Sequence, residues 1–160
     1  MLGDSASERA VYSFACGLAR LVYRVKAIGL ENLPPGGFLL VPNHITWVDA
    51  IILQLACPRA VRFVIDEEFY RNPVLRLPLR MVRVIPINRR KPREAIRRAT
   101  EQIEAGQIVC IFPEGQLSRT GTLARLQRGY EMIAHHAGCP VVPVFLDQLW
   151  GSIFSFSGGK

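Results

Sequence analysis

Five short, mostly apolar runs alternate with stretches of helical character along the chain, and this alternation constrains the fold more than any other feature. The runs predict strands over residues 38–41, 61–65, 84–87, 108–112 and 141–145. A strand–helix–strand order favours parallel pairing, because each parallel connection needs a long crossover. We therefore predict an α/β fold: a single layered domain with a mostly parallel mixed sheet flanked by helices.

Helix start and stop signals lie between the apolar runs. Helices are predicted from the turn after the first run to residue 57, from residue 72 with an interruption at Pro78, over residues 92–105 and over residues 126–137. Gly106 and Gly138 follow the last two, as is typical of helix C-terminal caps. The run at 108–112 is apolar throughout, which predicts a strand buried on both faces.

The two ends of the chain flank an expected α/β core at residues 38–147. Residues 7–26 repeat apolar side chains at three-to-four spacing with arginines beside them, which predicts an amphipathic helix within residues 1–28. This helix packs on the domain or lies in a membrane interface, and the two roles are compatible. Residues 148–160 form an apolar tail that belongs to the core or meets lipid, and its end looks like a cut in a longer chain.

Charge and cysteine usage narrow the classes of partner and compartment. Lys and Arg number 20 against 13 Asp and Glu, and the net charge of +7 suits nucleic acid, anionic lipid or an acidic carrier protein. No uncharged apolar stretch of about 18 residues occurs, so no transmembrane helix is predicted, and a secretory signal is not evident. The four cysteines are dispersed, which indicates reduced core residues in the cytosol and no metal site.

His44 and Asp49 lie between the first predicted strand and the helix that follows it. The pattern places His44 in a tight turn and Asp49 in the first helical turn, so imidazole and carboxylate can meet across a short loop. A carboxylate that holds one ring nitrogen leaves the other free to take a proton near neutral pH. The pair predicts a general base and its orienting group, without an evident protein nucleophile. The alternative is a structural histidine, because such a spacing also arises by chance.

Two further polar stretches follow predicted strands. Arg89 comes after the third strand, where a planar guanidinium could grip a phosphate. After the fourth strand, Pro113 and Gly115 make a tight turn around Glu114, whose carboxylate could accept hydrogen bonds from an acceptor's hydroxyls. A solvated loop and a capping glutamate are the structural alternatives. Because the carboxyl ends of parallel strands share one edge, these side chains and His44 are expected to converge.

Together these stretches resemble the motif blocks of the glycerolipid acyltransferases, the family that contains 1-acylglycerol-3-phosphate acyltransferase. The matching stretches are, in order, Asn43-His44-x4-Asp49, Ile85-x-Ile87-x-Arg89, Phe112-Pro113-Glu114-Gly115 and Val142-Pro143-Val144. Two departures are visible. Arg83 stands where the family has glycine, and Gln116-Leu117-Ser118 replaces a usual Thr-Arg-Ser, with Arg119 one place later.

A narrower likeness involves residues 63–68, 111–122 and 149–159. These stretches are similar to the acyltransferase domain of bacterial bifunctional 2-acylglycerophosphoethanolamine acyltransferase/acyl-carrier-protein synthetases. In that subfamily an adenylating domain follows, so the likeness implies a fused acyl-carrier-protein synthetase in the full-length protein. The two departures lie where this subfamily differs from the phosphatidate-forming enzymes.

The resemblance implies a phospholipid-biosynthetic enzyme that works without a cofactor or metal. It would move a fatty acyl group from acyl carrier protein or acyl-CoA to the hydroxyl of a lysophospholipid, at the cytoplasmic face of a membrane. The acceptor's hydroxyl is the nucleophile, which accounts for the missing protein nucleophile. His44 and Asp49 would be catalytic, and the implied substrate-binding residues are Arg89, Glu114, Gly115, Gln116 and Arg119.

Two alternatives stay open at this point. The first is strict acylation of 1-acyl-sn-glycerol-3-phosphate to phosphatidate. The second is a non-catalytic basic module that binds lipid or nucleic acid, motivated by the net charge of +7. The aromatic spacing expected of a single-strand binder is missing from the sequence, and the resemblance implies no nucleic acid partner.

Overall fold

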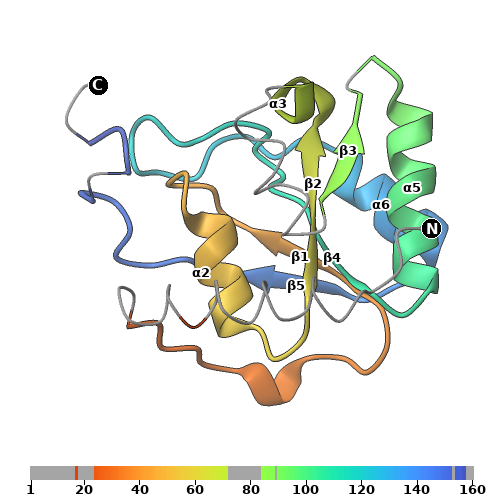
Figure 1. The fold of residues 1–160 in the computed structure, drawn as a ribbon, viewed down its shortest axis with the longest axis horizontal. Helices are drawn as coiled ribbons and strands as arrows, with labels where there is room; N and C mark the ends of the chain where they lie inside the picture. The colour runs from red at the N-terminus through yellow and green to blue at the C-terminus, as the bar shows by residue number, and fades with distance from the viewer. Residues whose placement is uncertain (1–16, 18–23, 72–83, 89, 153, 158–160) are drawn as a thin grey trace.

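A five-stranded parallel sheet forms the centre of the computed structural model, which describes residues 17, 24–71, 84–88, 90–152 and 154–157. The strand order is β3-β2-β4-β1-β5, and every neighbouring pair is parallel. The strands are β1 (Phe38–Pro42), β2 (Val61–Asp66), β3 (Ile85–Ile87), β4 (Ile108–Cys110) and β5 (Val141–Val144). The predicted α/β class is confirmed, and the described sheet is wholly parallel where a mostly parallel one was expected (Figure 1).

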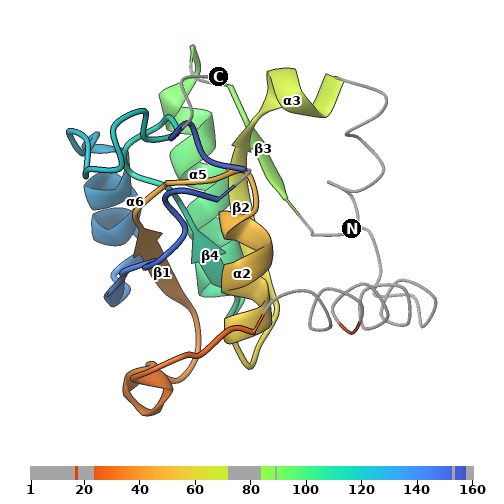
Figure 2. The ribbon, with the colours of Figure 1, turned by 90° about the vertical axis from the view of Figure 1, so that its left-hand side faces the viewer.

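Helices cover both faces of this sheet, as Figures 1 and 2 show. The elements are the 3-10 helix η1 (Leu30–Asn32) and the helices α2 (Asp49–Ala56), α3 (Glu67–Arg71), α5 (Pro92–Glu104) and α6 (Gly129–Ala137). Helix α2 packs on one face, where Ile52 and Leu53 join the core cluster with Phe38. Helices α5 and α6 pack on the other face through Ile96 and Ile133.

Strand β1 shows why the sheet needs two apolar layers. Phe38 and Leu40 belong to the cluster under α2, whereas Leu39 belongs to the cluster under α5 and α6. Successive side chains of a strand point to opposite faces, so a strand covered on both sides is apolar at every position. Strand β4 behaves in the same way, and its complete burial confirms the prediction for the run that begins at residue 108.

The structure corrects several predicted boundaries. Helix α6 begins at Gly129 rather than at residue 126, because the N–H of Gln127 instead donates to the carbonyl of Pro113 across a loop. Strand β4 ends at Cys110 rather than at residue 112, because the carbonyl of Phe112 closes a turn by accepting from the N–H of Gly115. Helix α3 was not predicted. The left-handed Gly138, at φ 55°, confirms the predicted cap of α6.

Two predicted helices fall largely or wholly outside the described residues: the N-terminal amphipathic helix, of which Gly17 is described as helical, and the helix from residue 72. Arg89 also lies outside them. Within the described part of the chain, no helix is both long and apolar enough to cross a bilayer.

The sheet order decides which loops can meet. Strands β1 and β4 are parallel neighbours, with Leu40 opposite Cys110. The loops that follow them, residues 43–48 and 111–128, therefore leave the same edge of the sheet. Strand β3 stands at the end of the sheet, separated from β1 by β2 and β4. The first and third polar stretches of the sequence are thus brought together directly.

Candidate active site

The imidazole of His44 and the carboxylate of Asp49 are hydrogen-bonded across the turn that joins β1 to α2. The distance from His44 Nδ1 to Asp49 Oδ2 is 2.9 Å. An ionised carboxylate can only accept, so Nδ1 donates to Asp49, and in the neutral imidazole Nε2 then keeps the free lone pair. The structure confirms the predicted contact between imidazole and carboxylate. Nε2 is then the ring nitrogen that can take a proton.

Asp49 is held in place by the turn that it closes. Its side chain is 0% exposed, and Oδ2 also accepts from the backbone N–H of Ile45 at 2.6 Å and of Thr46 at 3.0 Å. The Thr46 hydroxyl donates to Oδ1. Asp49 is also the first residue of α2, where a negative charge interacts favourably with the helix dipole. A buried carboxylate with this many donors has one orientation, and it fixes the ring of His44.

The ring of Phe112 packs against one face of the His44 imidazole. The two rings are stacked, with centroids 3.8 Å apart and an interplanar angle of 18°. The ring of His44 is therefore restrained by Phe112 on its face and by Asp49 at Nδ1. Its side chain still exposes 22% of its surface, so the imidazole is partly open to solvent.

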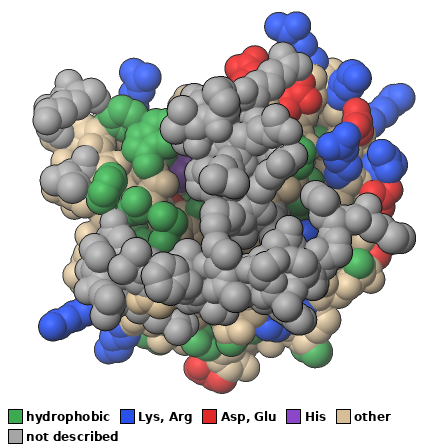
Figure 3. Space-filling model, in the orientation of Figure 1, with side chains coloured by type: hydrophobic (Ala, Val, Ile, Leu, Met, Phe, Trp, Pro, Cys, Tyr) green, Lys and Arg blue, Asp and Glu red, His purple; other side chains and the backbone are tan. Residues whose placement is uncertain are grey.

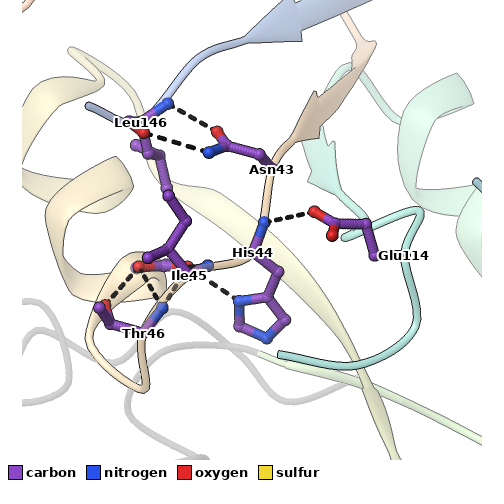
Figure 4. Close-up of polar contacts among 7 residues, drawn as sticks. Asn43, His44, Ile45, Thr46, Glu114 and Leu146 are labelled. Carbon is purple, nitrogen blue, oxygen red and sulfur yellow. Dashed lines mark hydrogen bonds and ion pairs between the residues drawn. The ribbon is translucent and has the colours of Figure 1, made fainter. Parts of the chain in front are cut away.

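Glu114 holds the backbone of His44. Its Oε1 accepts from the N–H of His44 at 2.7 Å, and its Oε2 accepts from the N–H of Ala124 at 2.9 Å. The carbonyl of His44 accepts in turn from the N–H of Ser118 at 2.8 Å. Figure 4 shows Glu114 reaching the backbone nitrogen of His44. The loop after β4 thus fastens both backbone polar groups of the candidate base.

This placement adds a role for Glu114 that sequence reasoning missed. Its side chain is buried, and the residue is 4% exposed. Both carboxylate oxygens already accept from backbone N–H groups, so Glu114 anchors the turn. Its predicted contact with acceptor hydroxyls stays a prediction. Gly115, at φ 69°, occupies the left-handed conformation that the tight turn requires.

Asn43 is a second residue whose role the sequence did not reveal. Its amide donates to the carbonyl of Leu146 at 3.1 Å, and its carbonyl oxygen accepts from the N–H of Leu146 at 2.7 Å. This pair, labelled in Figure 4, ties the end of β1 to the segment after β5. The available signal was its place beside His44 in the motif block.

Residues 24–147 match the protein-family model described as Acyltransferase. The chain belongs to the acyltransferase family. Among curated relatives, it is 33% identical over 129 residues to the chloroplastic 1-acyl-sn-glycerol-3-phosphate acyltransferase BAT2 of Brassica napus, covering 78% of this chain and 37% of the relative. It is 30% identical over 138 residues to the 1-acyl-sn-glycerol-3-phosphate acyltransferase of Pseudomonas aeruginosa, covering 82% and 53%.

A solved structure shares the fold of this acyltransferase chain. The crystal structure of the 1-acyl-sn-glycerophosphate acyltransferase PlsC from Thermotoga maritima superposes with a TM-score of 0.67 at 23% identity. The match covers 89% of this chain and 60% of that one. The chain therefore spans about a third to a half of the length of these two curated relatives, and somewhat more of the solved protein.

The remaining predicted binding residues of this acyltransferase lie along the same loop or beyond the described chain. Gln116 and Arg119 are exposed, and the guanidinium of Arg119 lies 5.8 Å from the centre of the Phe156 ring. Arg89 is outside the described residues. The structure thus brings His44, Asp49, Glu114 and Gly115 together, and it leaves the substrate contacts of the five predicted binding residues as predictions.

A small polar pocket opens beside the end of β3. Its volume is about 180 Å³, and its lining residues are Glu67, Pro86, Ile87, Asn88, Lys91, Glu94, Ala95 and Arg98. His44 is not among them. The Nδ2 of Asn88 donates to Oε1 of Glu67 at 2.7 Å. This pocket lies next to the predicted phosphate grip in sequence and apart from the base.

Burial disfavours the ionised thiol at each of the three described cysteines. Cys110 is fully buried, and burial, with the negative charges of Cys57 and Asp49, raises the pKa of its thiol well above the usual range. Burial also raises the pKa of Cys57 and Cys139. A thiol needs its ionised form to attack a carbonyl carbon. Across the described residues, no group of three or more His, Cys, Asp or Glu side chains could hold a metal ion.

Proposed function

We propose that this chain is the catalytic α/β part of a glycerophospholipid O-acyltransferase, which moves a fatty acyl group from acyl carrier protein or coenzyme A to the free hydroxyl of a lysophospholipid. The observation that carries the proposal is the 2.9 Å bond between His44 Nδ1 and Asp49, which leaves Nε2 without this partner on a partly exposed ring. A base arranged in this way can act on a substrate hydroxyl, and the reaction needs no protein nucleophile.

In the proposed mechanism His44 Nε2 takes the proton of the acceptor's hydroxyl as its oxygen attacks the thioester carbonyl. Asp49 stabilises the imidazolium that forms. The carbon–sulfur bond then breaks, and the thiolate leaves with the proton that His44 held. Backbone N–H groups are the proposed donors to the oxyanion. Arg89, Gln116 and Arg119 are proposed to bind the acceptor's phosphate, and Gly115 and Glu114 its glycerol part.

Two acceptors are supported by different observations. The first is 1-acyl-sn-glycerol-3-phosphate, the acceptor named for the similar enzymes of Brassica napus and Pseudomonas aeruginosa. The second is a lysophospholipid with a larger head group, such as 2-acylglycerophosphoethanolamine. It is favoured by the stretch Gln116-Leu117-Ser118, where the family's third block has Thr-Arg-Ser. If 2-acylglycerophosphoethanolamine is the acceptor, we also propose that an acyl-carrier-protein synthetase domain is fused to this chain in the full-length protein. The first acceptor implies no such domain.

A panel of acceptors tests this proposal. The full chain is incubated with a labelled acyl thioester of coenzyme A or of acyl carrier protein, and with each lysophospholipid in turn. The proposal predicts a labelled diacyl product with at least one acceptor. Transfer to 1-acyl-sn-glycerol-3-phosphate alone would select strict phosphatidate synthesis. If no acceptor is acylated while the chain binds DNA in a salt-dependent way, the proposal is wrong and a basic binding module replaces it.

The proposed location is the cytoplasmic face of a membrane, held peripherally. The net charge of +7 supports it, because anionic lipids attract basic proteins. The amphipathic pattern of residues 7–26 also supports it, since an interfacial helix needs an apolar face beside cationic side chains.

A further inference from the structure

The loop that anchors His44 also presents apolar side chains to solvent. Leu123 is 65% exposed and Leu126 is 39% exposed. Single exposed leucines are ordinary on protein surfaces. Here two exposed leucines lie three residues apart in the loop that is hydrogen-bonded to the turn of His44. Their exposure therefore calls for an explanation.

Backbone hydrogen bonds keep these leucines from turning inward. The N–H of Ala124, next to Leu123, donates to Glu114 at 2.9 Å. The N–H of Gln127, next to Leu126, donates to the carbonyl of Pro113 at 2.8 Å. At the start of the loop, the Ser118 hydroxyl donates to the carbonyl of Thr122 at 2.8 Å. The backbone of the loop is therefore held on both sides of Leu123 and beside Leu126, while both leucine side chains are exposed.

Cationic residues flank the leucines in the sequence. Arg119, Arg125 and Arg128 are exposed, and the sequence has no Asp or Glu from residue 115 to residue 130. A leucine pair among arginines has the composition of a surface that enters the boundary of a bilayer, with its cations on lipid phosphates. The local excess of positive charge is complementary to an anionic membrane.

Aromatic side chains of the C-terminal segment extend this surface. A Cβ placed on Gly121 would lie 2.6 Å from the ring of Trp150, so the loop backbone packs directly on the indole. Trp150 is still 36% exposed and Phe154 is 41% exposed. Figure 3 shows hydrophobic side chains gathered on the side that carries this loop and the C-terminal segment, beside a histidine. Tryptophan favours the membrane–water interface, because its ring is amphipathic.

We propose that residues 119–128 form a docking loop that inserts Leu123 and Leu126 into the surface of an anionic phospholipid membrane, with Arg125 on the lipid phosphates. Because Ala124 of this loop is bonded to Glu114, and Glu114 in turn holds the backbone N–H of His44, docking brings the base to the membrane surface where a lysophospholipid resides. In that respect the inference rests on the proposed function. Membrane binding itself is measured without reference to activity.

Vesicle sedimentation of the full chain tests the docking loop. Phosphatidylcholine vesicles with and without phosphatidylglycerol are compared. The double variant Leu123→Ser/Leu126→Ser should bind both vesicle types about tenfold more weakly, because it removes the inserted apolar surface. Arg125→Gln should weaken binding about fivefold on the anionic vesicles and leave binding to phosphatidylcholine unchanged. Met132→Gln alters a methionine on α6 that is 47% exposed, and this matched control should bind as the wild type does.

Three outcomes would overturn the docking loop: no binding of the wild type to anionic vesicles, wild-type binding by the leucine variant, or an equal loss in the Met132→Gln control. Weaker binding of the leucine variant to acyl carrier protein, with vesicle binding unchanged, would make the loop a protein-docking surface instead. Transfer to a water-soluble short-chain acceptor should be the same in the leucine variant and the wild type. If the wild type acylates no acceptor, the proposed function fails while the vesicle result still decides the loop.

Discussion

The carboxylate of Glu114 accepts a hydrogen bond of 2.7 Å from the backbone N–H of His44, a residue 70 positions earlier in the chain. The same side chain accepts from Ala124 at 2.9 Å. Glu114 was predicted to contact substrate, but it binds the backbone of the candidate base, His44. It thereby joins the loops that follow the neighbouring strands β1 and β4. The position of the imidazole depends on both loops.

Glu114→Gln separates the anchoring role from the predicted substrate contact. The amide nitrogen of glutamine cannot accept, so either His44 or Ala124 loses a partner for its N–H. We expect the free energy of unfolding to fall by about 1–3 kcal/mol, measured by urea denaturation. Anchoring predicts a lower kcat with KM for the acceptor nearly unchanged, because the base is misplaced. A higher KM at constant kcat would instead assign Glu114 to acceptor binding.

Asp49→Asn should reduce acyl transfer about 10²–10⁴-fold. An asparagine amide that donates to Nδ1 would move the ring proton to Nε2, and that nitrogen could no longer act as a base. The matched control is Thr46→Val, which removes the hydroxyl that donates to Asp49 but keeps the bond to His44. The control should lose about 1 kcal/mol of stability and keep most of its activity. Equal activity losses in the two variants would contradict the orienting role of Asp49.

Gly37 is expected to tolerate no side chain. A Cβ at this position would lie 1.9 Å from the carbonyl oxygen of Ile103, at the end of α5. Gly37→Ala must therefore displace β1 from α5, at a cost of about 1–3 kcal/mol or more. Gly129→Ala is the control, because a Cβ there meets nothing within 4 Å at the first residue of α6. It should gain up to about 1 kcal/mol, and a similar midpoint of thermal unfolding for both variants would be evidence against this packing.

Stability should fall as the pH rises above about 9, through the thiol of Cys110. Burial raises its pKa in the folded state, so the unfolded chain releases the proton first and folding must restore it. Stability is complete below the ordinary thiol pKa and declines above it, by about 1.4 kcal/mol per pH unit for one such group. Urea denaturation from pH 7 to pH 10 measures this slope. The Cys110→Ala variant should lack that part of the decline, and parallel curves would refute the assignment.

The strand pattern of the sheet was readable from the sequence because the described strands are short, mostly apolar runs between helical segments. The two boundaries that were predicted wrongly, the start of α6 and the end of β4, share one cause. Gln127 and Phe112 use their backbone groups in tertiary hydrogen bonds, which replace the continuation of a helix and of a strand. No local propensity contains that information. The short helix α3 follows β2 without a loop. Its start signal is Asp66, whose Oδ1 accepts from the N–H of Glu68 at 3.1 Å, and this signal was not used to predict a helix.

In the candidate site, too, the local contacts could be predicted from the sequence and the long-range contacts could not. His44 and Asp49 are close in sequence, so their hydrogen bond was predictable from the turn alone. The anchor from Glu114 and the pairing of Asn43 with Leu146 span 70 and 103 residues, and they exist only once the sheet order is known. Arg89 stays a prediction, because it lies beyond the described residues.

The most direct measurement of the central claim is the rate of acyl transfer by His44→Ala beside that of the wild type. Both use the same labelled thioester and the best acceptor of the panel, and circular dichroism verifies that the variant is folded. If His44 is the general base, the variant should be about 10²–10⁴-fold slower. A folded variant that transfers acyl groups at the wild-type rate would contradict the account.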